Sequence, residues 1–405
     1  MVTRRRLLSG AAGLAALSGC LQVGYVGSTG SGRSPVDLPV PESDLVRGTP
    51  RDAIPAITDP AFGPDWSGVS LEARTVDFGV RRIEPRLAPF DRVVGLVRDG
   101  RARAYPLRVL GWHEVVNDVL GEPLLVSYCP LCGSAVVARR RVAGAERFGG
   151  SGSDATGAPT DEAITFGVSG LLWNDNLVMY DAETDSLWSQ IAATAIRGPL
   201  AGTELELVPA TLARWDEWRS EHPDTEVLLP PPRSDTVVGR GYAAVRDYTF
   251  DPYAAYGSND DVGFAELGGE ERAAGGRSTD DRLPAKVEVL GVVQGEAAKA
   301  YPRPIVERER VIDDRVGGVP VVVAVTPGGS MVAYERTVGG RTLEFRAGAD
   351  DTAVADGSRW RVTTGEAVDG PHAGATLARA NDRPAMFWFA WADVHPGTAV
   401  YGEPG

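Results

Sequence analysis

The sequence predicts a mainly β protein, with α+β as the alternative class, built as two tandem β-rich modules that each end in a short helix. Two observations predict this fold. Short apolar runs rich in β-branched residues, such as residues 123–128 and 319–325, are bounded by turn residues and are typical of strands. The same series of motifs also occurs twice along the chain, which indicates an internal duplication.

The two copies carry their shared motifs in the same order. Residues 93–97 and the Ala-Tyr-Pro sequence at 104–106 return as residues 289–293 and the Ala-Tyr-Pro sequence at 300–302. Each copy closes on two tryptophans and a His-Pro pair. The later matches are 186–188 with 358–360, 198–202 with 370–374, and 215–223 with 388–396.

Turns and helices can be placed within each copy. Asp-Gly at 99–100 and Gly-Gly at 339–340 separate apolar runs, so we expect hairpin turns there. Residues 211–222 and 385–395 are predicted to form the closing helices, the second from a weaker pattern.

The N-terminus predicts export and a lipid anchor. Residues 1–19 carry three arginines and a short apolar stretch, as in a twin-arginine signal peptide, and the stretch is shorter than the about 20 residues of a membrane span. Cys20 follows in a lipobox-like sequence, so we expect lipidation there and attachment to the outer face of the cytoplasmic membrane. A plain signal peptide is the alternative. Residues 20–60 are predicted to be a flexible tether, with folding beginning near Trp66.

The remaining chain is predicted to divide into three parts. Residues 61–228 form the first β-rich module, which carries a Cys-x-x-Cys pair, and residues 284–405 form the second, which lacks it. Residues 229–283 form an acidic connector that is longer than a plain loop, so we expect it to cover a site. Residues 139–161 resemble a local insertion in the first module.

Composition excludes some function classes. The formal net charge is −14 and the basic residues are almost all arginine, with lysine only at Lys286 and Lys299. An acidic, lysine-poor surface is typical of a halophilic protein, and it argues against nucleic acid as a partner because nucleic acid requires a basic face. We also expect no nucleotide cofactor.

The chemistry-bearing feature is the sequence Cys129-Pro-Leu-Cys132-Gly. It follows one apolar run and precedes another, so the pair is predicted to lie at a strand–turn–strand corner. This spacing suits a zinc knuckle, and it also suits a dithiol redox site. A four-cysteine metal site is impossible within one chain, because the only other cysteine is Cys20.

His113 is the predicted third ligand of a metal bound by the two cysteines. It belongs to the copy that carries the thiols, and Glu309 stands at its place in the other copy. Thr326 and Gly329 replace the cysteines there, so all three positions change together. Glu114, Asn117 and Asp118 are predicted to surround the site. The other histidines are assigned to structural or incidental positions: His222, His395 and His372.

Three other motifs are weaker. His113-Glu114 begins like the His-Glu-x-x-His zinc motif, but Asn117 stands where the second histidine belongs. Residues 166–170 resemble a nucleophile elbow without its final glycine. Residues 174–176 are explained more simply as a polar turn than as a cation site.

These residues also resemble a known family. The resemblance rests on His113-Glu114, Asn117-Asp118, the sequence Tyr-Cys-Pro-Leu-Cys-Gly at 128–133, Phe-Gly-Val-Ser-Gly at 166–170, and residues 176–181 and 186–190. In these the chain is similar to exported proteins classed as domain of unknown function 3179, over most of residues 90–400. The resemblance implies that the thiol pair is not peculiar to this chain, and it implies no activity.

Three functions remain open from the sequence. The first is a lipid-anchored extracytoplasmic protein with a Cys129, Cys132 and His113 site for zinc or copper, which handles metal for a membrane-bound client or catalyses a metal-dependent reaction. The second is a thiol–disulfide oxidoreductase that cycles Cys129 and Cys132, with His113 or Glu114 tuning the thiolate. The third is a binding module with a structural disulfide.

Overall fold

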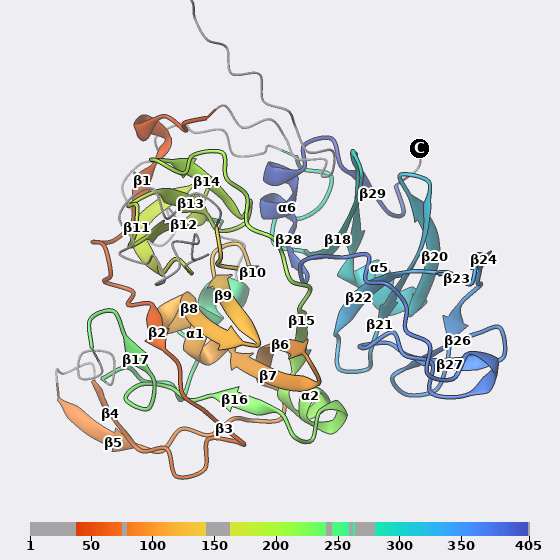
Figure 1. Cartoon of the computed structure of the whole chain (residues 1–405), viewed down its shortest axis with the longest axis horizontal. Helices are drawn as coiled ribbons and strands as arrows, with labels where there is room; N and C mark the ends of the chain where they lie inside the picture. Colours follow the sequence, from red (N-terminus) through yellow and green to blue (C-terminus); the bar gives the residue numbers. More distant parts are fainter. Residues whose placement is uncertain are drawn as a thin grey trace, which may run out of the picture. The chain divides into compact units, whose positions relative to one another are not determined.

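Strands dominate the structure, which confirms the predicted mainly β class. The structure is a computed structural model, and it describes residues 38–74, 79–142, 163–239, 245–258, 262–263 and 280–403. Within these residues the sheets are arranged like the blades of a six-bladed propeller. Figure 1 shows these sheets and the short helices that accompany them. The predicted signal peptide, Cys20 and most of the predicted insertion lie outside the described residues.

The first half of the chain contains a hairpin, a helix and a three-stranded meander. Strands β6 (Arg92–Arg98) and β7 (Arg101–Pro106) pair around the predicted turn at Asp99 and Gly100. Both turn residues have positive φ, 51° and 73°, as two-residue hairpins favour. The chain continues through α1 (Leu107–His113), β8 (Val115–Leu120), β9 (Glu122–Cys129) and β10 (Ser134–Arg139).

The second half repeats this series of elements. Val93 pairs with Pro106 in the first hairpin, and Val289 pairs with Pro302 in the second. The elements are β18 (Glu288–Gln294), β19 (Ala297–Pro302), α5 (Arg303–Glu309), β20 (Val311–Val316), β21 (Val319–Val325) and β22 (Met331–Glu335). Helices α1 and α5 are missing from the prediction, because each has only 7 residues, too few for helical periodicity to show.

The two predicted closing helices exist but are shorter than predicted. The first four residues of the 211–222 segment form strand β15 (Thr211–Arg214), and the helix is α2 (Trp215–Glu221). In the second half, β28 (Met386–Phe387) likewise precedes α6 (Trp388–Val394). The first residues of both predicted helices therefore form strands instead, because β15 pairs with β6 and β28 pairs with β18.

A tryptophan from each of these helices packs flat against a glycine. A Cβ atom built on Gly95 would lie 2.4 Å from the Trp218 ring, and one built on Gly291 would lie 1.9 Å from the Trp391 ring. No side chain larger than hydrogen fits between the strand and the indole. The same close approach thus fixes helix against hairpin in both halves.

The predicted tether ends earlier than residue 60. Val40, Ala56 and Ile57 are buried, and residues 46–47 and 57–59 form strands β1 (Val46–Arg47) and β2 (Ile57–Asp59) that pair with β11 and β8. The described chain is therefore folded from its first residues, well before Trp66. Apolar residues among the polar and Pro-rich ones explain the difference, because each inserts into an existing sheet.

Other strands complete the sheets around these two halves. β1 lies beside β11 (Phe166–Trp173), β12 (Asn176–Asp181), β13 (Leu187–Ser189) and β14 (Thr194–Arg197). The first half also contains η1 (Glu42–Asp44), β3 (Phe62–Gly63), β4 (Leu71–Arg74), β5 (Val80–Ile83), β16 (Glu226–Leu228), β17 (Asp235–Thr236) and α4 (Ala254–Ser258). The second half adds β23 (Thr337–Val338), β24 (Arg341–Thr342), β25 (Arg346–Ala347), β26 (Thr352–Ala355), β27 (Ser358–Arg361), η4 (Gly370–His372) and β29 (Ala399–Val400).

The two halves share an apolar cluster. It includes Cys132 from the first half with Trp388 and Trp391 from the second, whereas other clusters are confined to one half. Arg92 and Glu288 stand at matching positions, one residue before the matched strand segments, and their side chains form an ion pair of 2.6 Å. The contacts are reciprocal, because β10 lies against β28 while β22 lies against β15.

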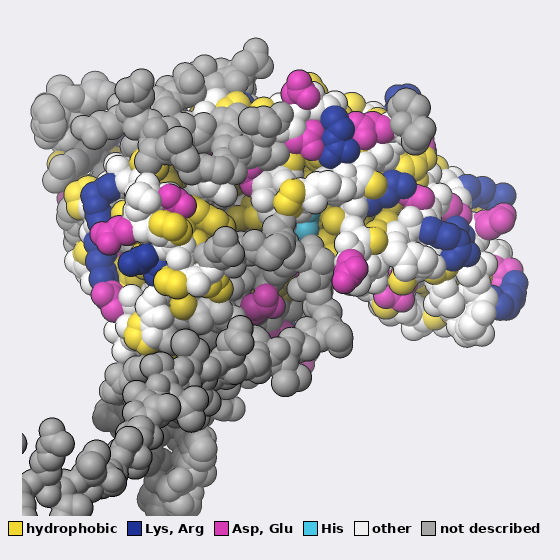
Figure 2. All heavy atoms as spheres, turned by 90° about the horizontal axis from the view of Figure 1, so that it is seen from above, with side chains coloured by type: hydrophobic (Ala, Val, Ile, Leu, Met, Phe, Trp, Pro, Cys, Tyr) yellow, Lys and Arg dark blue, Asp and Glu magenta, His cyan; other side chains and the backbone are white. Residues whose placement is uncertain are grey.

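The surface carries charges of both signs. Figure 2 shows acidic and basic side chains interspersed on one face, in keeping with surface pairs such as Arg359 with Asp369 and Arg341 with Asp356. Pairing of this kind contributes little to stability. None of the helices in the described ranges has the length and hydropathy that crossing a membrane requires.

Candidate functional site

Cys129 and Cys132 lie at a strand–turn–strand corner, as predicted. Cys129 ends β9 and pairs with Ser134 at the start of β10, and Gly133 closes the turn with a φ of 59°. Both thiols are free, and both residues are buried, with exposed fractions of 1% and 0%. The pair is therefore held inside the shared apolar cluster and not on an exposed loop.

A second hairpin supplies the polar partners of the thiols. Both Sγ atoms point to the carbonyl oxygen of Asp175, at 3.9 Å from Cys129 and 3.5 Å from Cys132. The Asn176 Nδ2 atom also donates to the Cys132 Sγ atom at 3.5 Å. Asn174 and Asp175 both have positive φ, so this segment is a two-residue hairpin turn between β11 and β12. The predicted polar turn is confirmed, but its contact with the thiols is not evident from the sequence.

A buried amide network fixes the orientation of Asn176. Its Nδ2 atom also donates to Gln190 Oε1 at 3.0 Å, and its Oδ1 atom accepts from the Ile191 backbone at 3.0 Å. Gln190 in turn accepts from the Ser134 hydroxyl and donates to the Ser134 carbonyl. Because each of these groups has its partner, the donor aimed at the Cys132 sulfur is held in place.

The two thiols ionise unequally. Burial opposes ionisation of Cys129, but hydrogen bonds from the Cys132 thiol and from the backbone N–H groups of Leu177, Cys132 and Leu131 lower its pKa below the usual value. Burial, together with the hydrogen bond to Cys129 and its charge, raises the pKa of Cys132 well above the usual value. Of the two thiols, Cys129 is therefore the one that ionises more readily.

Glu114 is a buried acid near Cys129. It caps the C-terminus of α1 in the left-handed region, with a φ of 56°. Burial and the charge of Cys129 raise its pKa well above the usual value, so the carboxyl retains its proton. Arg310 takes the same conformation after α5, with a φ of 68°. The backbone shape is therefore common to both halves, and the acid is particular to the half with the thiols.

Glu114→Gln is expected to stabilise the protein at neutral pH. The pKa of Glu114 is higher in the folded state than in the unfolded state, where it is about 4.5, so the folded state binds the proton more tightly. The free energy of unfolding of the wild type therefore falls as the pH rises from about 4.5 to the folded-state pKa. Glutamine removes this dependence. In thermal unfolding between pH 4 and 8, the melting temperature of Glu114→Gln minus that of the wild type should increase as the pH rises. The exposed control Glu72→Gln should show no such increase. A variant less stable at every pH would contradict this account.

His113 does not join the thiols. Its Nδ1–H donates to the Pro55 carbonyl at 2.7 Å, and its Nε2 accepts from the Tyr248 hydroxyl at 2.7 Å. Burial lowers its pKa to about 3, so the ring is neutral. In the described part of the chain, no three His, Cys, Asp or Glu side chains converge as a metal site would require. The structure thus leaves Cys129 and Cys132 without the predicted third ligand.

Asn117 and Asp118 are engaged in the scaffold. Asn117 exchanges side-chain hydrogen bonds of 2.8 Å with the backbone N–H and carbonyl of Phe166. Asp118 accepts from Arg103 and from the Tyr105 hydroxyl, both at 2.6 Å. These hydrogen bonds tie β8 to neighbouring strands. Among the residues predicted around the site, Glu114 is the one with an electrostatic link to a thiol.

The comparisons with known proteins agree with this frame. A family model described as a protein of unknown function, DUF3179, matches residues 51–398. The chain belongs to the DUF3179 family. No curated protein and no solved structure matches it. Membership in DUF3179 confirms the resemblance drawn from the sequence and brings no activity with it.

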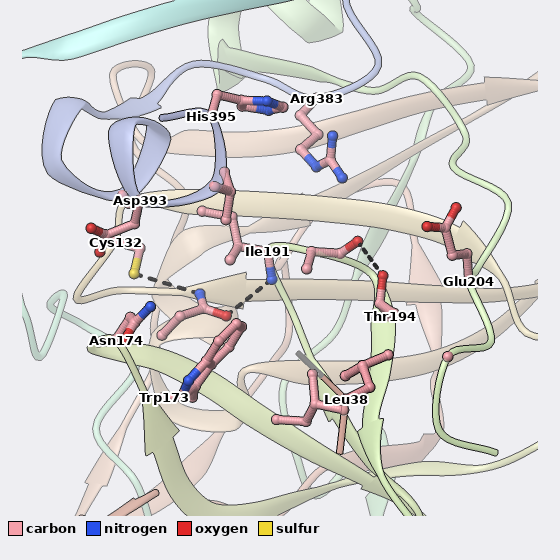
Figure 3. Close-up of a pocket in the computed structure, with 16 residues that line it drawn as sticks. Leu38, Cys132, Trp173, Asn174, Ile191, Thr194, Glu204, Arg383, Asp393 and His395 are labelled. Carbon is pink, nitrogen blue, oxygen red and sulfur yellow. Dashed lines mark hydrogen bonds between the residues drawn. The ribbon is translucent and has the colours of Figure 1, made fainter. Parts of the chain in front are cut away.

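In this DUF3179 chain a cavity of about 350 Å³ borders the thiol pair (Figure 3). Cys132 forms part of its wall, together with Trp173 from β11. Asp393 and His395 come from the end of α6, so both halves of the chain contribute to the cavity. Cys129 is not among the lining residues.

Two described residues of the predicted connector contact the cysteine corner and His113. The Tyr256 hydroxyl donates to the carbonyl of Leu131, between the two cysteines, at 2.9 Å. Tyr248 makes the hydrogen bond to His113 already described. That residues 229–283 cover a site stays a prediction. Residues 240–244, 259–261 and 264–279 lie outside the described residues.

Other candidate residues have structural roles. The Ser169 hydroxyl is buried and donates to the Val178 carbonyl, so it is not placed as an exposed nucleophile. His222 and His395 are the C-cap residues of α2 and α6, and each ring packs on a tryptophan of its helix. His372 pairs with Asp356 at 2.9 Å near the surface.

Proposed function

We propose that the protein is a thiol–disulfide oxidoreductase whose redox pair is Cys129 and Cys132. One observation carries this proposal: two free thiols share the Asp175 carbonyl, and Cys132, but not Cys129, is among the residues that line a cavity. Two thiols that converge on one oxygen atom in a short turn can close to a disulfide with little movement. The unequal ionisation of the pair supports the same proposal.

We propose a direction for the exchange step. In the oxidised pair, an incoming thiolate attacks the Sγ atom of Cys132, the cysteine that lines the cavity. The disulfide bond breaks, and Cys129 leaves with the electron pair as a thiolate. This thiolate accepts hydrogen bonds from backbone N–H groups. A second thiol then resolves the mixed disulfide and releases Cys132, which takes up a proton. Because a thiol with a lower pKa leaves faster, the arrangement favours attack at Cys132 over attack at Cys129.

Glu114 is a carboxyl group that can hold or release a proton near the pair. Its carboxyl is protonated when Cys129 is charged. When the thiolate of Cys129 attacks an electrophilic sulfur and loses its charge, the electrostatic cause that raises the pKa of Glu114 is removed. We propose that Glu114 is a positioning and proton-holding group, in place of the metal-ligand role predicted for its neighbour His113.

Serine substitution of either cysteine is expected to abolish exchange. The full chain should catalyse the reduction of a model disulfide by dithiothreitol, and Cys129→Ser and Cys132→Ser should each lower the rate to background. Thr326→Ser is a matched control, because residue 326 takes the place of Cys129 in the other half and is also buried. Catalysis that survives in both cysteine variants would contradict the proposal.

A soft metal ion at the same two sulfurs is the second candidate. Its support is the convergence of two thiols, one with a lowered pKa, since thiolates are the ligands that select Cu(I) and zinc. We propose it without His113, so a partner or a small ligand would complete the coordination. Metal titration of the reduced full chain tests it. Binding of about one copper or zinc that both serine variants lose, combined with no disulfide exchange, would favour this candidate.

We also propose that the protein works outside the cytoplasmic membrane, anchored through lipidated Cys20. The support is the twin-arginine pattern and the lipobox-like sequence before Cys20. An exported location suits a redox pair, because disulfides form and persist there. Membrane fractionation tests the anchor: Cys20→Ala should move the protein to the soluble fraction, and retention in the membrane would contradict it.

A further inference from the structure

The cavity beside Cys132 has the dimensions of a small-molecule site. Its volume is about 350 Å³, at the lower end of the range for ligand pockets. Much of its wall is apolar, with Trp173, Ile191 and Val394 among the lining residues. Figure 3 shows the side chains of Trp173 and Ile191 together with that of Cys132 around one space.

The polar groups of this cavity define what it accepts. The Oδ1 atom of Asn174 is buried and has no hydrogen-bond partner in the described part of the chain. Asn174 lines the cavity, so this acceptor can be satisfied by a ligand that carries an N–H group. Two acidic residues, Glu204 and Asp393, and one basic residue, Arg383, also line the wall, and each of the three has interactions of its own. The excess of acidic over basic residues in this lining favours a cationic donor over an anionic one.

Burial restricts the size of the redox partner. The exposed fractions of Cys129 and Cys132 are 1% and 0%, so neither residue is presented to a protein partner at the surface, and Cys132 has to open toward the cavity that it lines before a ligand can react with it. A small molecule inside the cavity lies against the Cys132 side of the pair. The proposed function therefore requires a partner that enters the cavity.

We infer that this cavity binds a low-molecular-weight aminothiol, or the disulfide of one, as the redox partner of Cys129 and Cys132. The inference rests on the proposed function. The aminothiol thiolate attacks Cys132, and Cys129 leaves with the electron pair. A second aminothiol attacks the ligand sulfur of the mixed disulfide and releases Cys132, which is protonated. Two aminothiols are oxidised to one disulfide, and the protein disulfide is reduced to two thiols.

The test compares small thiols of similar size and different charge. The oxidised full chain is reduced with cysteamine and with mercaptoethanesulfonate at equal thiolate concentration, and each rate is divided by the rate for a model disulfide. We expect a preference of about tenfold for cysteamine in the wild type. Asn174→Gly keeps the positive φ of the turn and removes the acceptor, so it should lower this preference. The matched control is Asp99→Gly, in the hairpin turn of β6 and β7, which should retain it.

A trapping measurement makes the result independent of any single variant. Cys129→Ser leaves Cys132 without its resolving thiol, so cystamine should form a stable mixed disulfide on Cys132, detected by mass. Ala192→Phe narrows the cavity and should suppress this adduct, whereas Ala182→Phe at an exposed position should not.

The outcomes separate this inference from the proposed function. Equal normalised rates for the two thiols, or adduct formation that Ala192→Phe leaves unchanged, would overturn the inference while exchange with dithiothreitol still stands. A dithiol that no thiol can reversibly reduce would overturn the proposed function itself.

Discussion

His113→Ala is expected to destabilise the fold by about 4 kcal/mol without removing the redox pair. The substitution deletes a fully buried ring and removes the hydrogen bonds that it makes with the Pro55 carbonyl and the Tyr248 hydroxyl. A buried unsatisfied group costs about 1–3 kcal/mol, and a large-to-small core change adds a cavity cost of about 2–5 kcal/mol. Denaturant unfolding of the full chain measures the loss, with His372→Ala as the control near the surface.

The lowered pKa of His113 predicts that the free energy of unfolding decreases in acid. The folded pKa of His113 is about 3 and the unfolded value is 6.5, so the unfolded state binds the proton more tightly. Stability from the neutral ring is complete above pH 6.5 and falls as pH drops toward about 3. His113→Ala should lack this decrease. If the variant keeps wild-type stability and instead loses a bound metal, the ligand role predicted from the sequence would be restored.

Glu288→Gln is expected to weaken the junction between the halves by about 2 kcal/mol. The carboxylate pairs with Arg92 and Arg303, which hold its pKa at about 2 in spite of burial. Removing the charge leaves two arginines without their shared partner. The cost of breaking a buried pair is about 3–5 kcal/mol, and it is reduced here because the side chains of Arg92, Glu288 and Arg303 are 38%, 18% and 22% exposed.

The pH dependence of Glu288 has the opposite origin to that of Glu114. Its folded pKa is lowered, so its contribution is present above about pH 4.5 and is lost as pH falls toward about 2. Unfolding curves in this window should be flatter for Glu288→Gln. Glu307→Gln breaks the more exposed pair with Arg303 and should change stability by less than about 1 kcal/mol. Equal losses for the two variants would show that Glu288 has no special role at the junction.

The sequence predicted the strands of this fold better than its helices. Hairpins at Asp99-Gly100 and Gly339-Gly340 were predictable, because only a few residues favour two consecutive positive φ values. The boundaries at 211 and 385 were not, because pairing with β6 and β18 decides between strand and helix there. The start of the folded chain was missed for a similar reason, since Ile57 becomes part of a sheet through residues far along the chain.

Some residues of the candidate site could be predicted from the sequence and others could not. Comparison of the two copies located Cys129 and Cys132, since their absence from the second copy set them apart from the scaffold. The same comparison favoured His113, which proved to be bound to Pro55 and Tyr248, while its neighbour Glu114 has the electrostatic link to the thiol. Sequence spacing places residues along the chain, but the side of α1 on which each side chain emerges depends on packing.

The Asp175 and Asn176 contacts could not be predicted from local sequence. These residues lie in a hairpin turn, and their relation to the thiols depends on how β11 and β12 pack against the Cys129–Cys132 corner. The polar turn itself was recognisable, because Asn and Asp tolerate the left-handed region. Its role as partner of the sulfurs requires the tertiary structure.

The most direct measurement of the central claim is the reduction potential of the Cys129–Cys132 pair in the full chain. The protein is equilibrated in thiol–disulfide buffers, and the free thiols are alkylated and counted by mass. We predict a two-electron transition at a potential above about −300 mV, in the range of exchange-active pairs. A potential below about −300 mV would identify a structural disulfide, and thiols that stay reduced in every buffer would also contradict the account.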